Sequence, residues 1–396
     1  MSSEQKPLIP YGRQTITEPD IAAVVKVLRS PSLTQGPVVP AFEQAVAAKV
    51  GARYGVAVNS ATSALHIACL ALGLAPGDQL WTSPITFVAS ANCGRYCGAT
   101  VDFVDIEPAT GLMSVAALQT KLEEAEHNGT LPKVVVPVHL TGSSCDMAAI
   151  GTLSERYGFA VLEDASHAIG ARYQGEPVGN CRYSAITVFS FHPVKIITTG
   201  EGGLATTNDP ELAQLMAELR SHGIVRGAER FEQPTPGLWA YEQQQLGFNY
   251  RLTDIQAALG LSQLQRLDEI ITERNRQLQR YRVLLADTPV QLLEVPAEVL
   301  SSVHLAVIRL QQATPEQHRQ VFEGLRAAGI GVQLHYTPVH LQPYYRKIGF
   351  EEGNFPVAEA YATSAVSLPL FPGLTENEQV RVFTSLGECL RLLGLF

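Results

Sequence analysis

The chain is poor in charged side chains, and positive ones are scarcer than negative ones. Of its 396 residues only 17% are charged, with 29 Lys and Arg against 38 Asp and Glu, which gives a formal net charge of −9. An acidic chain of this kind is not expected to present the basic surface that nucleic acids bind. A small anionic ligand stays open, because it needs only a local site. The 46% share of hydrophobic residues excludes a disordered chain.

Long apolar runs are also absent from the sequence. No stretch reaches the ~18 consecutive apolar residues that a membrane-spanning helix needs. The first residues, MSSEQKPLIP, contain no apolar leader segment. The sequence therefore predicts a cytoplasmic protein that does not contact a membrane.

Cysteine is scarce, and its six positions are scattered through apolar surroundings. This is typical of a reduced, cytosolic protein: Cys69, Cys93, Cys97, Cys145, Cys181 and Cys389. Cys93 and Cys97 are four residues apart and would share one face of a helix. A metal site would need two further ligands, which the neighbouring sequence does not supply at a recognisable spacing. We expect both to be small core residues and expect no metal site.

Short apolar runs alternate with helical patterns over the first half of the chain. Most of the runs are β-branched and bounded by Gly, Pro or Asp, so we expect strands at Tyr54–Val58, Gln79–Ser83, Thr100–Val104, Lys133–Val138, Phe159–Glu163, Ala185–Phe189 and Gly203–Thr207. Helices are expected at Thr62–Leu72 and Met147–Tyr157. The alternation predicts an α/β fold with a mostly parallel sheet flanked by helices, and ligands then bind beyond the carboxyl ends of the strands.

The second half of the chain has a different organisation. Leu252–Val283 contains no Pro and no Gly after Gly260, which predicts one long bridging helix. Beyond it we expect a smaller α+β unit with strands at His304–Leu310 and Val332–His335 and helices at Pro315–Ala328 and Glu376–Leu392. The predicted division is a large domain over residues 1–251, a bridging helix over 252–284 and a small C-terminal domain over 285–396.

The segment SFHPVK, which ends at Lys195, is followed by the glycine-rich TTGEGG. Lys195 stands between Val194 and Ile196, so a compact fold removes it partly from water. Desolvation lowers the pKa of a lysine and makes its amine able to form a Schiff base with an aldehyde cofactor. Taken alone, Lys195 is better interpreted as a surface lysine whose stem packs on apolar neighbours.

A carboxylate at the end of another strand adds to this pattern. Asp164 follows the apolar run Phe159–Leu162, and a carboxylate facing a pyridine nitrogen holds that nitrogen protonated. A Schiff-base lysine with an aspartate partner is the signature of pyridoxal phosphate enzymes. The alternative is that Asp164 only caps the next segment. His167 could pack near the same ring or be a structural histidine.

Three further features suit a flat, phosphorylated ring. Asn59–Ala64 joins a strand to a helix, and a helix N-terminus with small residues and hydroxyls binds phosphate, although an ordinary cap has the same sequence. Ser190 can add a hydroxyl. Phe87 can stack on a ring or belong to the core.

Together these motifs resemble the DegT/StrS family of sugar aminotransferases. The resemblance covers essentially the whole chain and is carried by LTQGP (Leu33–Pro37), NSATSAL (Asn59–Leu65), SPITFVASAN (Ser83–Asn92), EDASHAIGA (Glu163–Ala171), SFHPVK (Ser190–Lys195), TTGEGG (Thr198–Gly203), RSHGI (Arg220–Ile224), GFNYRLTDIQAALG (Gly247–Gly260), HYTPVH (His335–His340) and SLPLFP (Ser367–Pro372). It implies the aspartate-aminotransferase-like fold (fold type I) and pyridoxal 5′-phosphate as cofactor.

The resemblance also implies roles for individual residues. Lys195 is the catalytic Schiff-base lysine, Asp164 the partner of the pyridinium and Phe87 the aromatic residue on the ring. Cofactor contacts are implied for Ala61, Thr62, Ser190, Asn249 and His167, the last of which stands where many relatives have Gln. Asn249 would be lent by the neighbouring subunit of a homodimer. Substrate contacts are implied for Ala61, Ser190 and Asn249, and for Tyr11, Pro31, Ser32, Leu33, Thr34, Gln333, Leu334, His335, Tyr336 and Tyr345.

Within the family the motifs are most similar to those of the pseudaminic-acid pathway subgroup. That similarity implies amino transfer from L-glutamate to C4 of UDP-2-acetamido-2,6-dideoxy-β-L-arabino-hex-4-ulose, giving UDP-4-amino-4,6-dideoxy-N-acetyl-β-L-altrosamine. Relatives that aminate UDP-D-, dTDP- or GDP-linked 4-keto sugars have much the same motifs and stay as alternatives.

A dehydratase of this scaffold would carry His at the position of Lys195. A non-catalytic cofactor-binding regulator and a phosphate-binding protein without cofactor are more distant alternatives. Lys26, Arg226 and Arg251 are candidate bases for the substrate diphosphate.

Overall fold

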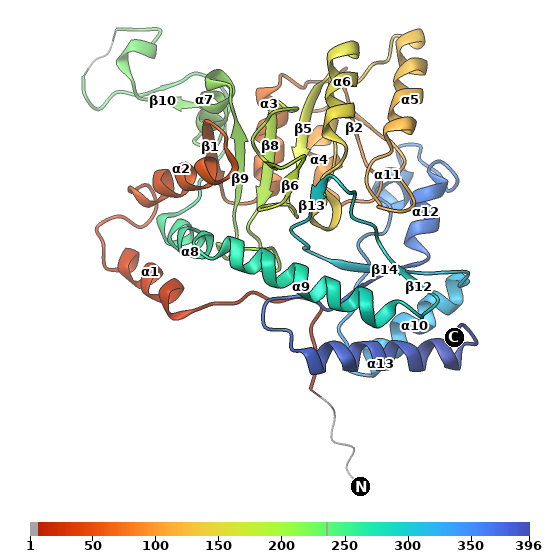
Figure 1. Cartoon of the computed structure of the whole chain (residues 1–396). Helices are drawn as coiled ribbons and strands as arrows, with labels where there is room; N and C mark the ends of the chain where they lie inside the picture. The colour runs from red at the N-terminus through yellow and green to blue at the C-terminus, as the bar shows by residue number, and fades with distance from the viewer. Residues whose placement is uncertain (1–6, 235–236) are drawn as a thin grey trace.

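A seven-stranded sheet forms the centre of the larger part of the molecule in a computed structural model, which describes residues 7–234 and 237–396 (Figure 1). The strands lie in the order β1-β9-β8-β5-β4-β2-β3, with the bounds β1 Tyr54–Val58, β2 Gln79–Thr82, β3 Thr100–Phe103, β4 Val134–Val136, β5 Ala160–Asp164, β8 Ile186–Ser190 and β9 Gly203–Thr207. Every neighbouring pair is parallel except the two that β9 makes with β1 and β8. The predicted α/β fold with a mostly parallel sheet is confirmed.

Because β9 is antiparallel to both neighbours, β1 runs in the same direction as the remaining strands, and their carboxyl ends share one edge of the sheet. Helices supply the crossovers, as parallel strands require. Those of the larger part are α1 Glu18–Leu28, α2 Val38–Val50, α3 Ala61–Ala71, α4 Ala89–Tyr96, α5 Val115–Asn128, α6 Met147–Tyr157 and α7 Pro210–Leu219. The helix α3 packs against β1, β8 and β9, while α6 packs against β5. Two small sheets lie outside this one: a pair of β10 Ile224–Val225 with β11 Glu242–Gln243, and a three-stranded sheet in the order β13 Val299–Leu300, β6 Arg172–Tyr173 and β7 Glu176–Pro177.

The C-terminal part has a small antiparallel sheet of its own. Its strands are β12 Val290–Leu292, β14 Ala306–Leu310 and β15 Ala365–Leu368, and its helices are α10 Pro315–Ala327, α11 Pro343–Arg346, α12 Pro356–Ala362 and α13 Glu376–Leu392. Apolar side chains of β14, β15, α10 and α13, among them Ile308, Val366, Leu325 and Leu386, form a separate core. In Figure 1 this part lies beside one end of the long helix α9 (Leu267–Leu285). The division into two domains and a bridge stays a prediction.

The prediction of one continuous helix over Leu252–Val283 is wrong. The structure divides the segment into α8 (Asp254–Leu264) and α9, with a turn at Gln265 and Arg266. Arg266 leaves helical geometry at φ −104° and ψ 9°, and its guanidinium donates to the buried carboxylate of Asp20 in α1, at 2.8 Å. This contact with α1 lies at the break, where tertiary structure overrides a helix-forming sequence.

The predicted strand at Val332–His335 is also wrong. Gln333 forms only an isolated bridge with Ser367. The backbone pairing goes no further, and the His335 imidazole contacts the Ser367 hydroxyl with its side chain, at 2.8 Å.

Two simpler findings complete the fold. Cys93 and Cys97 are both buried beside or within α4. Within residues 7–234 and 237–396, no helix is long and apolar enough to cross a membrane.

Candidate active site

A cavity of about 670 Å³ opens at the carboxyl edge of the large sheet. Its wall joins the segments that follow β1, β2, β4, β5 and β8 to side chains from the C-terminal part. The residues in contact with it are Tyr11, Asn59, Ser60, Ala61, Thr62, Ser63, Leu65, Thr86, Phe87, Ala89, Val138, Asp164, Ser166, His167, Ser190, His192, Val194, Lys195, Glu201, His304, His335 and Tyr336. The topology therefore brings together the lysine, the carboxylate, the helix N-terminus and the aromatic residue that the sequence singled out.

Lys195 lies in the turn that follows β8, where its backbone N–H donates to the His192 carbonyl at 2.9 Å. Removal from water within the cavity lowers the pKa of its ammonium group to about 8, although the nearby Asp164 carboxylate acts in the opposite direction. A lysine of this pKa has an appreciable unprotonated fraction near neutral pH and is a usable nucleophile.

Asp164 is the last residue of β5 and is only 5% exposed. One of its carboxylate oxygens accepts the backbone N–H of Ser166 at 3.1 Å, and the other accepts the hydroxyl of Ser90 at 2.6 Å. Each oxygen still has a lone pair, and the residue lines the cavity. Asp164 is thus a fixed acceptor for a ligand that carries a positive N–H.

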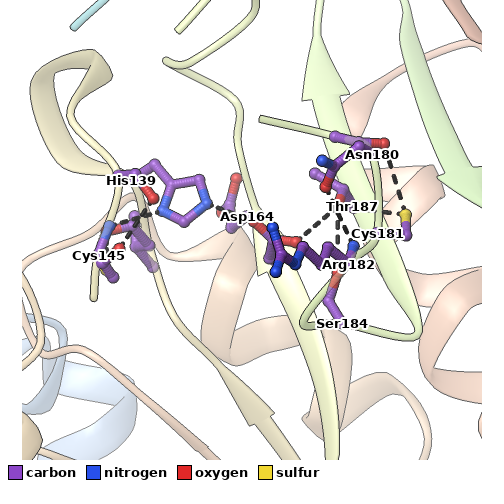
Figure 2. A network of polar contacts seen from close by, with 12 residues as sticks. His139, Cys145, Asp164, Asn180, Cys181, Arg182, Ser184 and Thr187 are labelled. Carbon is purple, nitrogen blue, oxygen red and sulfur yellow. Dashed lines mark hydrogen bonds and ion pairs between the residues drawn. The ribbon is translucent and has the colours of Figure 1, made fainter. Parts of the chain in front are cut away.

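A buried polar network holds the strand end that carries Asp164 (Figure 2). The preceding residue, Glu163, contacts His139 Nε2 at 2.7 Å and accepts hydrogen bonds from Thr187, at 2.9 Å, and Ser184. The Cys145 backbone N–H donates to His139 Nδ1 at 3.2 Å, so the imidazole proton is on Nε2 and points at Glu163. Burial alone would raise the pKa of Glu163, but these donors outweigh it and lower that pKa. The network fixes β5 against its neighbouring strands.

The N-terminus of α3 forms another side of the cavity. The hydroxyl of Ser60, the N-cap, accepts the backbone N–H of Ser63 at 3.2 Å. The first N–H groups of a helix have no intrahelical acceptor, so Ala61 and Thr62 keep theirs for a ligand. Gly203, at the start of β9, allows that strand to lie close to the N-terminus of α3, because a Cβ at this position would lie 2.5 Å from the Ala61 nitrogen. Ser190, also in the wall, adds a hydroxyl.

Aromatic rings face the cavity from two sides. Phe87 is 59% exposed although it follows a buried strand, which leaves its ring free to cover a flat ligand. The ring of Tyr336 lies 6.4 Å from that of Phe87. Burial raises the pKa of Tyr336, so its hydroxyl stays protonated, and it lies within hydrogen-bond distance of His167 Nε2, at 3.2 Å.

Three histidines in the wall are held neutral. Burial lowers the pKa of His167 and His304 far below the usual value, and the charge of Lys195 acts in the same direction on both. For the same reasons the pKa of His335 falls to about 3. The rings of His167 and His304 are 4.4 Å apart. His304 was missed by the sequence analysis, since one histidine in the apolar run SVHLAV gives no signal of a site.

Several residues singled out from the sequence do not line this cavity. Asn249 is exposed and pairs with Ser221 in an isolated bridge. Tyr345 is 1% exposed and donates to Asn92 at 2.9 Å within the core. The other positions outside the described wall are Pro31, Ser32, Leu33, Thr34, Gln333 and Leu334, and the candidate bases Lys26, Arg226 and Arg251.

Positive charge is therefore scarce in the cavity. Among the described wall residues, Lys195 is the only Lys or Arg. Within this chain, an anionic ligand of the cavity therefore depends on helix N–H groups and hydroxyls.

Known proteins of one family are similar to this chain over most of its length. The sequence pattern of the DegT/DnrJ/EryC1/StrS aminotransferase family matches residues 14–387. The chain is 38% identical over 383 residues to the spore coat polysaccharide biosynthesis protein SpsC of Bacillus subtilis (strain 168), which covers 96% of each chain.

Solved structures show the same similarity. Helicobacter pylori PseC, an aminotransferase involved in the biosynthesis of pseudaminic acid, superposes with a TM-score of 0.89 at 30% identity, over 97% of this chain and 100% of that one. Spr1654 of Streptococcus pneumoniae, a putative sugar aminotransferase solved in its PMP form, gives the same TM-score, identity and coverage. It has also been solved in a PLP form, with a TM-score of 0.88 at 28% identity, over 98% of this chain and 99% of that one.

Proposed function

Because the chain belongs to the DegT/DnrJ/EryC1/StrS aminotransferase family, we propose that it transfers an amino group from L-glutamate to C4 of a nucleotide-linked 4-keto sugar. The observation that carries the proposal is the desolvated Lys195, with a pKa of about 8, in one cavity with Asp164 and the N-terminus of α3. A phosphate-binding protein would need the helix N-terminus but not this lysine.

Pyridoxal 5′-phosphate is the cofactor, and the donor set of the cavity fits it. Ala61, Thr62 and Ser190 would hold its phosphate, Phe87 would cover its ring and Asp164 would take its ring nitrogen. Gly203 lets β9 pack directly against the helix end that would hold the phosphate, because a Cβ there would lie 2.5 Å from the Ala61 nitrogen. When bound, the cofactor supplies the aldehyde that carries the amino group and the electron sink that stabilises a carbanion.

The residues of the chain then divide the remaining work. Nζ of Lys195 removes the proton from Cα of glutamate and later delivers a proton to C4 of the sugar, as a general base and acid must have a pKa near the working pH. The negative charge of Asp164 keeps the ring nitrogen protonated. Neutral His167, His304 and His335 add no positive charge that would compete with Lys195 for this carboxylate.

For the acceptor we propose UDP-2-acetamido-2,6-dideoxy-β-L-arabino-hex-4-ulose, aminated to UDP-4-amino-4,6-dideoxy-N-acetyl-β-L-altrosamine. The support is the subgroup likeness of SFHPVKIITTGEGG and RSHGI in the sequence, together with the similarity to PseC. His335, Tyr336 and Tyr11 would contact the sugar from the C-terminal side of the cavity.

A second acceptor class has an observation in its favour. The identity to SpsC, at 38%, exceeds the 30% to PseC. A different 4-keto-6-deoxy sugar, linked to UDP in the D-configuration, to dTDP or to GDP, is the alternative substrate.

A homodimer with shared active sites completes the proposal. The exposed Asn249 and the shortage of cations in the described wall both suit a site that a second subunit finishes. Arg226 and Arg251, which do not line the cavity of their own chain, are available to a partner's site.

The test is a panel of UDP-, dTDP- and GDP-linked 4-keto-6-deoxy sugars offered with glutamate and pyridoxal phosphate. Release of 2-oxoglutarate and the C4 configuration of the product are measured. The proposal expects glutamate-dependent product with the UDP-β-L-arabino substrate above all others. A preference for another member moves the assignment to the alternative, and no 2-oxoglutarate with any member refutes amino transfer.

A further inference from the structure

Asp164 is backed by a pair of buried hydroxyls that no part of the proposed function uses. Ser90, at the start of α4, is 0% exposed, and its Oγ lies 2.6 Å from Asp164 Oδ2. Thr86, 2% exposed, lies with its Oγ1 at 2.7 Å from the same Ser90 oxygen. Ser90 itself does not line the described cavity wall, so it acts from behind the carboxylate.

The geometry sets the direction of these hydrogen bonds. A hydroxyl has one proton to donate, and the carboxylate of Asp164 can only accept. The Ser90 proton has a second possible acceptor in the Phe87 carbonyl, but at 3.4 Å against 2.6 Å the charged and closer oxygen is preferred. The Ser90 oxygen then accepts the proton of Thr86. The two hydrogen bonds, from Thr86 to Ser90 and from Ser90 to Asp164, therefore run in the same direction. In such a chain, the first hydrogen bond polarises the second and strengthens it.

We propose that Thr86 and Ser90 form a one-way hydrogen-bond relay that holds the Asp164 carboxylate as an acceptor, so that the proton shared with the cofactor stays on the ring nitrogen. Ser90 is the positioning residue, since it acts through Asp164 and touches neither cofactor nor substrate. The inference rests on the proposed role of Asp164.

The physical reason is a competition for one proton. A carboxylate and a ring nitrogen that face each other share a proton, and donors on the carboxylate make it the weaker base. The Ser166 N–H donates a hydrogen bond to Oδ1 of Asp164, and the Ser90 hydroxyl is the side-chain donor to Oδ2. Without Ser90 the proton shifts toward Asp164, and the ring loses part of its positive charge.

The test is Ser90→Ala in the full-length holoenzyme, with the pH titration of the visible absorbance of the bound cofactor as readout. A positive ring nitrogen disfavours a second positive charge on the same chromophore, so losing it raises the pH midpoint of the absorbance change. We expect a rise of about one pH unit and a roughly ten-fold weaker affinity for pyridoxal phosphate, as for one hydrogen bond to a charged group. Thr86→Val, which removes only the outer donor, should shift the midpoint in the same direction by less.

Ser83→Ala is the matched control. Ser83 is also a buried serine of this segment, 1% exposed, but its hydroxyl bonds to the backbone of Ile85. The Ser83→Ala variant should lose some stability toward unfolding and keep the wild-type pH midpoint of the cofactor absorbance change. A Ser90→Ala midpoint that equals that of Ser83→Ala overturns the relay.

Asp164→Asn separates failure of the inference from failure of the proposed function. If Asp164→Asn leaves cofactor affinity and midpoint unchanged, the role of Asp164 is wrong. If it changes both while Ser90→Ala changes neither, only the relay is wrong. If the relay is correct, adding Ser90→Ala to Asp164→Asn has almost no further effect on the midpoint, since the two then act on one proton.

Discussion

At the scale of single residues, the chemistry depends on how the cavity changes ordinary side chains. Burial opposes the charge of Lys195 and lowers its pKa, as the proposed nucleophile requires, and Asp164 limits that effect without cancelling it. The sequence singled out both residues, since each follows an apolar strand in a recognisable motif, and the structure places both in the cavity wall. It did not predict His304, whose position beside His167 depends on the packing of the C-terminal part onto the large sheet.

The lowered pKa of Lys195 predicts the pH dependence of cofactor binding. Only the unprotonated amine attacks an aldehyde, so the rate at which cofactor-free protein recombines with pyridoxal phosphate should rise with pH, with a midpoint near 8. Stopped-flow absorbance between about pH 6 and 10 measures this rate. The interval includes the lowered pKa of Lys195 and approaches the ordinary pKa of a lysine. Asp164→Asn removes the charge that raises this pKa, so its midpoint should be lower than that of the wild type. A midpoint near that of a free lysine would contradict the account.

At the scale of elements, strand and helix ends create the site. The ranges of β1, β9, α6 and α13 agree with the sequence prediction or nearly so, because their apolar periodicity and caps are local signals. The two wrong elements, the continuous helix over Leu252–Val283 and the strand at Val332–His335, both depend on contacts with distant segments. A local sequence pattern does not reveal the ion pair of Arg266 with Asp20 or the contact of His335 with Ser367, because the partners are far apart in the sequence.

The cap of α3 should serve both stability and cofactor binding. Ser60→Ala loses the bond to Ser63 N–H and should cost about 1 kcal/mol of the free energy of unfolding. It should also weaken pyridoxal phosphate binding, because the same helix end is proposed to hold the phosphate. Ser114→Ala is the control: Ser114 caps α5 and, like Ser60, makes a second side-chain bond, but it does not line the described cavity wall. Equal cofactor affinity in the two variants, measured by fluorescence titration, would refute the role of this helix end.

The contact between β9 and α3 should not tolerate a side chain. Gly203→Ala places a Cβ 2.5 Å from backbone atoms of Ser60 and Ala61, which cannot rotate away. We expect a loss of about 1–3 kcal/mol of stability, as for overpacking, and a displaced phosphate site. Gly12→Ala is a control, because its Cβ would meet nothing within 4 Å. Denaturant unfolding with and without pyridoxal phosphate measures both effects, and a Gly203→Ala protein stabilised by cofactor as much as wild type would contradict the prediction.

At the scale of the whole molecule, an acidic chain is proposed to bind anions. With a net charge of −9, long-range attraction cannot gather a nucleotide sugar, so affinity must come from local donors. The composition argued against a basic surface for nucleic acids, but it could not show that Lys195 is the only Lys or Arg in the described cavity wall. That shortage is the reason to look for a second subunit at the site.

Shared sites predict complementation between inactive variants. Lys195→Ala and Asn249→Ala should each be inactive or nearly so, because one removes the amine and the other removes a residue that we propose is lent to the partner's site. Refolded together, about half of the dimers would be hybrids, each with one intact site, giving about a quarter of wild-type activity. A mixture no more active than its components would exclude a contribution of Asn249 across the subunits.

The central claim is that Lys195 is the residue that carries pyridoxal phosphate. Holoenzyme treated with borohydride, digested and analysed by mass spectrometry tests it directly, with Lys195→Ala treated in parallel. The account predicts a phosphopyridoxyl group on the peptide that contains Lys195, and none in the variant. A label on another lysine, or the same labelling in Lys195→Ala, would contradict it.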